Sequence, residues 1–195
     1  GRLLGRMEGL GFELKCEASL STLTNDVVKS SAIEGENLNP EEVRSSIARR
    51  LGIDIAGLIP ASRAVEGIVE MMLDATQQFS KPLTKDRLFD WHAALFPTGR
   101  SGTHKITVGG WRTIDAGPMQ VVSGPIGKEK VHFEAPDADR LEKEMHAFLK
   151  WFGNNDDIDP VIKAGIAHLW FVTIHPFEDG NGRIARAIGD MALAR

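Results

Sequence analysis

The sequence is poor in cysteine and has no excess of basic residues. Cys16 is the only cysteine among 195 residues, so no disulfide can form within the chain. This fits a reducing compartment such as the cytoplasm. Lys and Arg number 23 against 27 Asp and Glu, which gives a formal net charge of −4. That balance argues against a broadly basic surface for direct nucleic-acid binding.

Long hydrophobic runs are also missing. No apolar stretch approaches the roughly 20 residues that a membrane-spanning helix needs, and no signal-peptide pattern opens the chain. We therefore expect a cytoplasmic protein that is not bound to a membrane. The hydrophobic fraction of 42% and the charged fraction of 26% are typical of a globular protein with one sizeable core.

The two ends of the chain suggest a piece of a longer protein. The sequence starts with Gly-Arg-Leu-Leu instead of Met, and it stops at Arg195 inside a predicted helix. We expect residues 1–55 to form an N-terminal helical region. Residues 56–195 would then form a core that is truncated at its C-terminal end.

Hydrophobic periodicity predicts a mainly α-helical fold. Standard start and stop signals bound the periodic stretches: Gly35 ends the first helix, Asn39 and Pro40 begin the second, and Asp159 with Pro160 begins the last of them. The predicted helices span residues 17–33, 40–50, 62–78, 84–95, 137–152 and 159–174.

Residues 105–124 interrupt this helical pattern. Gly109, Gly110, Gly117 and Pro118 punctuate the stretch, which also contains two short β-favouring pieces, 106–108 and 119–122. Turn signals between β-favouring pieces are typical of a hairpin. We therefore expect these two pieces to form one small hairpin.

The most informative stretch is 175–186, which reads His-Pro-Phe-Glu-Asp-Gly-Asn-Gly-Arg-Ile-Ala-Arg. His175 precedes a proline, so the helix that begins at Asp159 should end there, with the imidazole at its C-terminal end. The Gly-Asn-Gly turn can aim backbone N–H groups at one anion, and a helix that begins near Gly182 adds a favourable dipole. Arg183 and Arg186 share its first turn and have donors suited to phosphate. The stretch predicts a polyphosphate cradle beside a candidate base.

Each part of this stretch also has an ordinary explanation. Alone, the histidine would be structural, the glycines a plain turn, Asp179 an N-cap, and the arginines a solvated helix face. Their ordered combination is much harder to explain by chance. The stretch is no Walker A loop, which needs Gly-Lys-Ser/Thr, and no His-Glu-x-x-His zinc site, because His168 and His175 lie seven residues apart. We expect His168 to pack within its helix.

Residues 175–186 resemble the signature of the Fic family (filamentation induced by cAMP), His-x-Phe-x-(Asp/Glu)-Gly-Asn-Gly-Arg-x-x-Arg, at every defining position. The resemblance extends over residues 60–195 and implies a mainly α, Fic-type helical core with a small β-hairpin flap. Fic proteins typically transfer AMP from ATP to a hydroxyl group of a target protein. The resemblance therefore implies a protein adenylyltransferase.

The resemblance also implies a role for each signature residue. His175 would be the general base that takes the proton from a Ser, Thr or Tyr hydroxyl, and Asp179 would hold Mg²⁺ between the α- and β-phosphates of ATP. Phe177 would anchor the loop on the core. The phosphate-binding residues would be Gly180, Asn181 and Gly182 for phosphate oxygens, Arg183 for the β-phosphate and Arg186 for the γ-phosphate.

Fic proteins also have a β-hairpin flap on which a target protein docks as an added strand. The residues that resemble this docking edge are Met119, Gln120, Val121 and Val122. Main-chain hydrogen bonds would align the target with little demand on its sequence. An ordinary hairpin packed on the helices is the alternative.

Residues 30–35, Ser-Ser-Ala-Ile-Glu-Gly, resemble the inhibitory Ser/Thr-x-x-x-Glu-Gly/Asn motif of many Fic proteins. In that family the glutamate, here Glu34, pairs with the second signature arginine, here Arg186, and blocks the γ-phosphate position. Ser30 lies four residues earlier on the same helix face. The motif lies N-terminal to the core, as in the class II arrangement. An exposed charge in the last helical turn is the alternative for Glu34.

Other functions stay open at the level of sequence. Glu34 could orient a water that removes AMP from a modified protein, and the same residues would serve this reverse task. The domain could instead be a regulatory binding module attached to a DNA-binding domain beyond Arg195. Relatives in the family transfer UMP, phosphate or phosphocholine, and a homo-oligomer is open as the assembly. Because the chain has no tyrosine, self-modification within it would use Ser or Thr.

Overall fold

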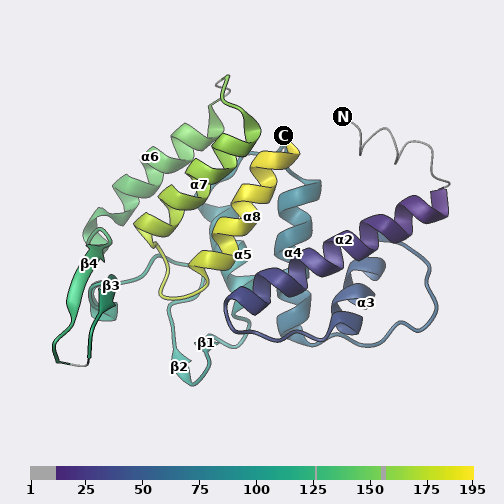
Figure 1. Ribbon diagram of the computed structural model, residues 1–195, viewed down its shortest axis with the longest axis horizontal. Coiled ribbons are helices and arrows are strands. Elements are labelled where there is room, and N and C mark those ends of the chain that lie inside the picture. Colours follow the sequence, from purple (N-terminus) through teal and green to yellow (C-terminus); the bar gives the residue numbers. More distant parts are fainter. Residues whose placement is uncertain (1–11, 126, 155–156) are drawn as a thin grey trace. The chain divides into compact units, whose positions relative to one another are not determined.

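The computed structural model describes residues 12–125, 127–154 and 157–195. This part of the chain contains seven α-helices and two small antiparallel sheets of two strands each (Figure 1). The predicted mainly α fold with a small hairpin is therefore confirmed. Within these residues no helix combines the length and the apolar character that crossing a bilayer requires.

The chain divides into two compact units, Gly1–Leu73 and Asp74–Arg195. Residues 1–11, with which the predicted N-terminal region begins, lie outside the described residues. The predicted boundary between residues 55 and 56 stays a prediction.

The first unit contains α2 (Phe12–Ile33), α3 (Pro40–Leu51) and most of α4 (Arg63–Gln77). α2 packs on α3. The predicted helix signals between them are confirmed: Gly35 follows α2 with a φ of 80°, and the Asn39 side chain accepts a hydrogen bond from the Glu41 N–H at 2.9 Å. Apolar residues of both helices are buried, among them Leu20, Val27, Val43 and Ile47.

Two arginines attach α3 to α4 inside this first unit. Arg49 and Arg50 both form salt bridges with Glu66, and Arg50 also pairs with Glu70. The Arg49 guanidinium further donates to the Ile59 carbonyl at 2.8 Å. These contacts fix the connection between the two helices.

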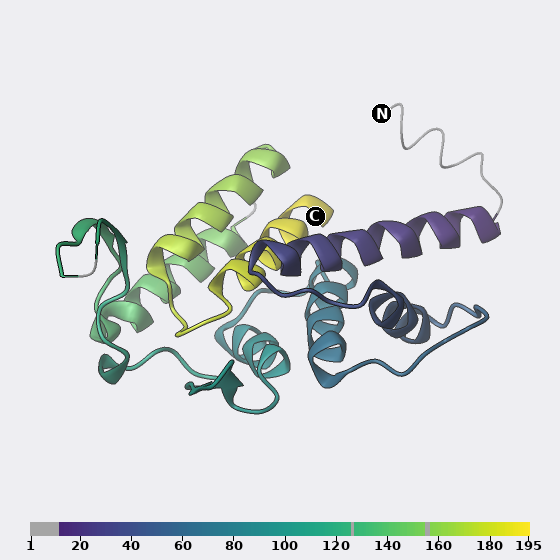
Figure 2. The same ribbon diagram turned by 60° about the horizontal axis from the view of Figure 1, so that its bottom comes forward.

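The second unit is built on α5 (Lys85–Leu95), α6 (Leu141–Gly153), α7 (Pro160–Ile174) and α8 (Asn181–Ala194). α7 packs along α8, α6 packs on α7, and α5 contacts α8. Figures 1 and 2 show α6, α7 and α8 side by side. Their buried side chains include Phe148, Phe152, Phe171, Ile184, Ile188 and Met191.

The sequence predicted a hairpin at residues 119–122 but named the wrong partner strand for it. β3 (Gln120–Ser123) pairs with β4 (Lys130–Glu134), whereas residues 106–108 belong to no strand. Glycines with positive φ at 124 and 127 make the turn between β3 and β4, and β4 alternates polar with apolar residues as strands do. The backbone of residues 106–108 is used elsewhere, since the Thr107 N–H donates to Glu178 at 3.3 Å.

A second, shorter hairpin joins β1 (Arg100–Ser101) to β2 (His104–Lys105). The sequence pattern did not predict it. The β3–β4 ribbon, called the flap below, projects from the start of α6 (Figure 1).

Candidate active site

α7 ends at His175 in a left-handed conformation, with φ 52° and ψ 58°. His175 is the only non-glycine residue with positive φ in the described ranges. Its N–H still donates to the Phe171 carbonyl at 3.0 Å, and Pro176 then prevents the helix from continuing. A left-handed side-chain-bearing residue costs about 1–2 kcal/mol, so surrounding contacts must hold His175 in place.

The half-buried His175 imidazole is uncharged at neutral pH. Burial lowers its pKa from 6.5, the hydrogen bond to the Val172 carbonyl raises it, and the nearby charges of Arg112 and Asp179 act in opposite directions. A neutral imidazole has one N–H donor and one nitrogen that can accept a proton. An acceptor nitrogen is what a general base needs.

Asn181 closes the loop that follows His175. Its side-chain N–H donates to the Phe177 carbonyl at 2.8 Å, and its side-chain oxygen accepts from the Phe177 N–H at 3.0 Å. The Asn181 side chain is buried. This amide therefore organises the loop, and the Asn181 backbone N–H is the group that would serve the predicted phosphate cradle.

His92 is a supporting residue that no sequence pattern predicted. Its ring stacks on the buried Phe177 ring at 4.2 Å between centroids and 7° between planes. The Gly109 N–H donates to its Nδ1, so Nε2 carries the proton and donates to the Asp179 carbonyl at 3.2 Å. Burial lowers the pKa of His92 to about 4, which keeps the ring neutral.

Asp179 presents a carboxylate at the turn between α7 and α8. One oxygen accepts from the Gly180 N–H, and the other accepts from the hydroxyl of Ser101 in β1. No cluster of three or more metal-binding side chains occurs in the described part of the chain. A single hard carboxylate oxygen fits Mg²⁺ that is held jointly with substrate phosphates.

Gly180 and the start of α8 would make the backbone part of the predicted phosphate cradle. Gly180 has φ 81°, and a Cβ there would lie 2.9 Å from the Phe96 ring, so a glycine is needed. α8 begins at Asn181. The first N–H groups of a helix have no intrahelical partner, so Asn181 and Gly182 supply donors at a helix N-terminus.

The two signature arginines differ in burial. Arg183 is buried, with its guanidinium 5.1 Å from the centroid of the Phe96 ring, whereas Arg186 is half-buried. The alternative of a solvated helix face is therefore wrong for Arg183. The contacts of both arginines with phosphate stay predictions.

The residues of the predicted inhibitory motif, Ser30 and Glu34, lie in the first unit. α2 ends at Ile33, as predicted, and Glu34 lies in the turn after the helix instead of in its last turn. The Glu34 N–H donates to the Ser31 carbonyl at 3.0 Å, and the Glu34 side chain is exposed. The inhibitory roles of Ser30 and Glu34 stay predictions.

The predicted docking edge lies on the flap. Val121 faces Phe133 and Val122 faces Val131, with a bulge between the two pairs. Met119 precedes the strand, and its carbonyl accepts from the Ala135 N–H at 2.9 Å. All residues of both strands are exposed. The alternative of a hairpin packed on the helices is therefore wrong, while target docking stays a prediction.

Comparison with family models identifies the class of protein. The Fic/DOC family matches residues 82–193, so the chain belongs to the Fic/DOC family. A second family, described as a domain of unknown function (DUF4172), matches residues 1–53.

Curated relatives carry transferase names. The chain is 24% identical over 173 residues to "Protein adenylyltransferase Fic" of Nematostella vectensis, which covers 87% of the chain and 37% of the relative. It is 28% identical over 123 residues to "Uridine 5'-monophosphate transferase" of Xanthomonas campestris pv. campestris (strain 8004), which covers 58% of the chain and 21% of the relative. The chain thus spans about a third or less of these relatives.

Solved structures of Fic proteins share the fold. A Fic domain-containing signaling protein from Bacteroides thetaiotaomicron matches with a TM-score of 0.68 at 21% identity, over 97% of this chain and 69% of that one. A Fic family protein from Desulfovibrio desulfuricans G20 matches with a TM-score of 0.62 at 26% identity, over 99% of this chain and 54% of that one.

Proposed function

We propose that this protein transfers AMP from ATP to a hydroxyl group of a target protein. The observation that carries the proposal is the site between α7 and α8. A neutral histidine with an acceptor nitrogen, a carboxylate and a helix N-terminus meet on one short loop. Relatives named protein adenylyltransferase support the same reaction.

In the proposed step the target hydroxyl oxygen attacks the α-phosphorus of ATP. A P–O bond to the target forms, the P–O bond to the β-phosphate breaks, and pyrophosphate leaves. His175 accepts the hydroxyl proton at its acceptor nitrogen, and base assistance of this kind is typically worth about 10²- to 10⁴-fold in rate. Mg²⁺ at Asp179 would supply positive charge beside the phosphates.

The phosphate groups would be held by the start of α8 and its arginines. Backbone donors of Asn181 and Gly182 suit the phosphate oxygens because they stand at the positive end of the helix dipole. Arg183 and Arg186 would add planar guanidinium donors for the β- and γ-phosphates. In this arrangement the charges that develop on pyrophosphate are stabilised by groups already in place.

The target protein would dock on the flap as a third strand. A two-stranded hairpin is marginally stable in water on its own, and the flap exposes Val121, Val122, Val131 and Phe133. An added strand would cover part of this apolar surface and satisfy free backbone groups along the edge.

Labelled nucleotides test the proposed reaction. The protein is incubated with Mg²⁺ and a cell extract, together with α-labelled ATP, γ-labelled ATP or α-labelled UTP. Label transfer to protein from α-labelled ATP alone supports AMP transfer, and transfer from γ-labelled ATP alone would mean a kinase. Transfer from UTP would instead favour the activity named for the Xanthomonas relative.

We further propose that Glu34 restrains the reaction by pairing with Arg186 in place of the γ-phosphate. Glu34→Gly should then raise AMP transfer, including self-modification of Ser or Thr. Glu36→Gly, two residues further along the same turn, is the matched control and should leave transfer unchanged. Equal transfer by wild type and Glu34→Gly would contradict the inhibitory role of Glu34.

Removal of AMP by the same site is tested with a modified protein. AMP-labelled target is incubated with wild type and with Glu34→Gly, and released AMP is measured. Release by wild type that Glu34→Gly loses would assign Glu34 to the reverse task. The absence of release from both proteins would leave transfer as the activity of the site.

A further inference from the structure

Arg112 connects three backbone carbonyls although only 4% of its surface is exposed. Its Nε donates to the His175 carbonyl at 2.8 Å, and its guanidinium also donates to the Pro136 carbonyl. Its own N–H donates to the Pro176 carbonyl at 2.8 Å. Two of these carbonyls belong to the residues that leave α7, and the third follows the flap.

The Arg112 guanidinium lies beside the one strained residue of the loop. His175 has the left-handed backbone described above, and its carbonyl points out of the helix end, where no later residue of α7 can bond it. A cation at a helix C-terminus is favourable because it opposes the negative end of the dipole. Arg112 fixes the carbonyls on both sides of the His175–Pro176 bond with one side chain and one N–H.

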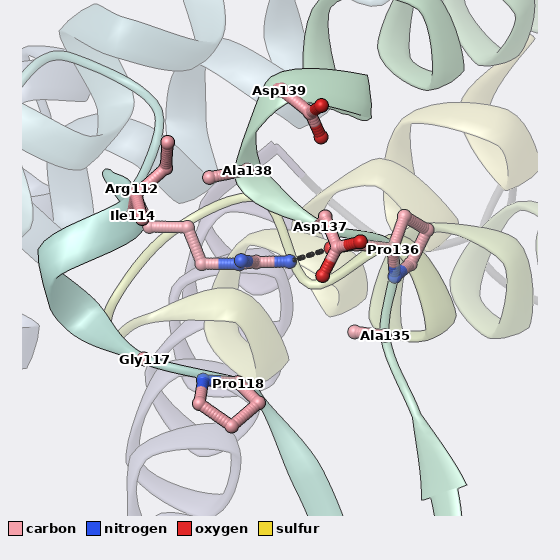
Figure 3. A pocket seen from close by; sticks show the side chains of 9 residues that line it. All are labelled: Arg112, Ile114, Gly117, Pro118, Ala135, Pro136, Asp137, Ala138 and Asp139. Atoms are coloured by element: carbon pink, nitrogen blue, oxygen red, sulfur yellow. Dashed lines mark hydrogen bonds between the residues drawn. The ribbon is translucent and has the colours of Figure 1, made fainter.

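Figure 3 shows the Arg112 side chain extending along a pocket toward Pro136 and Asp137. The pocket has a volume of about 330 Å³, and Pro118 and Ala135 from the two ends of the flap also line it. The Asp137 charge partly offsets the burial that lowers the pKa of the guanidinium. Arg112 therefore bridges the foot of the flap and the residue that carries the base.

We propose that Arg112 is a positioning residue for the transfer reaction, which holds His175 in its left-handed conformation and ties that conformation to the foot of the flap. This inference rests on the proposed function, in which His175 is the base. Arg112 touches no reacting atom and acts only through the His175 and Pro176 carbonyls. Misplacing a catalytic group by about 1 Å can cost about 10²-fold in rate.

The charge of Arg112 gives the proposal a second, independent signal. Arg112 lowers the pKa of the His175 imidazole, whereas Asp179 raises it. Removal of the guanidinium should therefore raise the pKa of His175. The acidic limb of the pH–rate profile should move to higher pH, because the base must be neutral to accept a proton.

The test compares Arg112→Met and Arg112→Lys with Arg140→Met. Arg140 is exposed and pairs with the half-buried Glu144, so its variant is the matched control. The measurements are kcat and KM for ATP, the pH profile, and the NMR titration of His175, whose signal is identified by its loss in His175→Gln. Thermal unfolding reports whether each variant is folded.

Arg112→Met should lower kcat by about 10²-fold with KM for ATP nearly unchanged, and its His175 signal should titrate at higher pH. Arg112→Lys keeps the positive charge, but its donors lie on one nitrogen instead of a planar fork. It should therefore retain the wild-type titration of His175 and still have a lower kcat. If Arg112→Met does not fold, Arg112→Lys alone tests the positioning role of Arg112. Wild-type kcat in a folded Arg112→Lys protein would overturn the proposal.

Failure of the proposed function is distinguishable from failure of this inference. If neither wild type nor Glu34→Gly transfers nucleotide, the function proposed above fails, but the NMR titration still reports on Arg112. A His175 signal that is identical in position and titration in wild type and Arg112→Met would then overturn the positioning role. Arg140→Met should match wild type in every measurement.

Discussion

The signature loop and the flap are proposed to act on the same reaction, yet they are built in opposite ways. Loop residues are held by buried side chains: Asn181 bonds Phe177, and His92 stacks beneath it. Every strand residue of the flap is exposed, including Val121 at 59% and Phe133 at 41%. The loop is preorganised without substrate, whereas the flap leaves apolar surface and a strand edge uncovered.

This difference matches the two tasks. A base and a phosphate cradle work best when their geometry is fixed in advance, because no free energy is then spent on ordering them during the reaction. A docking edge must instead keep its backbone groups free for a partner. Mutations should therefore separate the two regions, with large effects on catalysis and stability in the loop and small effects on stability in the flap.

The largest effect is expected for His175→Ala. Loss of the base should lower AMP transfer by about 10²- to 10⁴-fold, while the unfolding temperature changes little because the ring is only half-buried. In wild type, kcat/KM should stay high below pH 6.5, since burial lowers the pKa of His175 and the neutral form persists to lower pH.

The control for this substitution is His146→Ala, which removes an exposed imidazole from α6. It should transfer AMP at the wild-type rate. Full activity in His175→Ala would contradict the role of His175 as the general base of the signature loop.

Asn181→Ala should be the most destabilising substitution in the loop. It leaves the N–H and carbonyl of Phe177 without their side-chain partners, and each unsatisfied buried group costs about 1–3 kcal/mol. We expect a loss of about 2–4 kcal/mol, or a fall of roughly 5–15 °C in the unfolding temperature. Thermal unfolding followed by circular dichroism measures it.

Asn37→Ala, at an exposed position of the first unit, is the matched control and should leave the unfolding temperature within about 1 °C. An equally small change in Asn181→Ala would mean that the loop is not held by its internal hydrogen bonds. Its rigidity would then need another source.

His92 should make the stability of the loop depend on pH. Its folded-state pKa of about 4 lies below the ordinary 6.5, so folding favours the neutral ring. This stability is fully present above pH 6.5 and is lost as pH falls toward 4, by about 2–3 kcal/mol at about 1.4 kcal/mol per pKa unit. Urea unfolding of wild type and His92→Gln at pH 7 and pH 4 measures the difference.

The glutamine variant should lose less stability than wild type between the two pH values, because it has no proton to gain at this position. His104→Gln, at an exposed residue of β2, should behave as wild type. Parallel losses in wild type and His92→Gln would show that other groups cause the acid sensitivity.

The loop could be predicted from the sequence because its signals are local. The proline after His175 and the Gly-Asn-Gly turn act within a few residues, and so do the helix caps at Gly35, Asn39 and Asp159. Family resemblance then supplied roles for these positions. Short-range steric rules decide such features, whatever the rest of the chain does.

The supporting residues could not be predicted in this way. His92 and Ser101 lie 87 and 78 residues before Asp179, and Arg112 lies 63 residues before His175. Only tertiary packing brings them together. The pairing of the flap failed for a related reason: the segment 106–108 had β-favouring residues, but its backbone bonds the distant Glu178 instead of a strand.

The smallest effect on stability is expected in the flap. The exposed pair Val121 and Phe133 contributes little to folding, so Val121→Ser with Phe133→Ser should change the free energy of unfolding by less than about 1 kcal/mol. Transfer to the target protein should nevertheless fall through a higher KM for the target, by about tenfold, while KM for ATP is unchanged. Val161→Ser on α7, where the valine is 69% exposed, makes the same chemical change outside the flap and should alter neither constant. A large loss of stability in the flap variant would mean that the ribbon is part of the core, and the contrast with the loop would disappear. An unchanged KM for the target in a stable flap variant would move target docking to another surface.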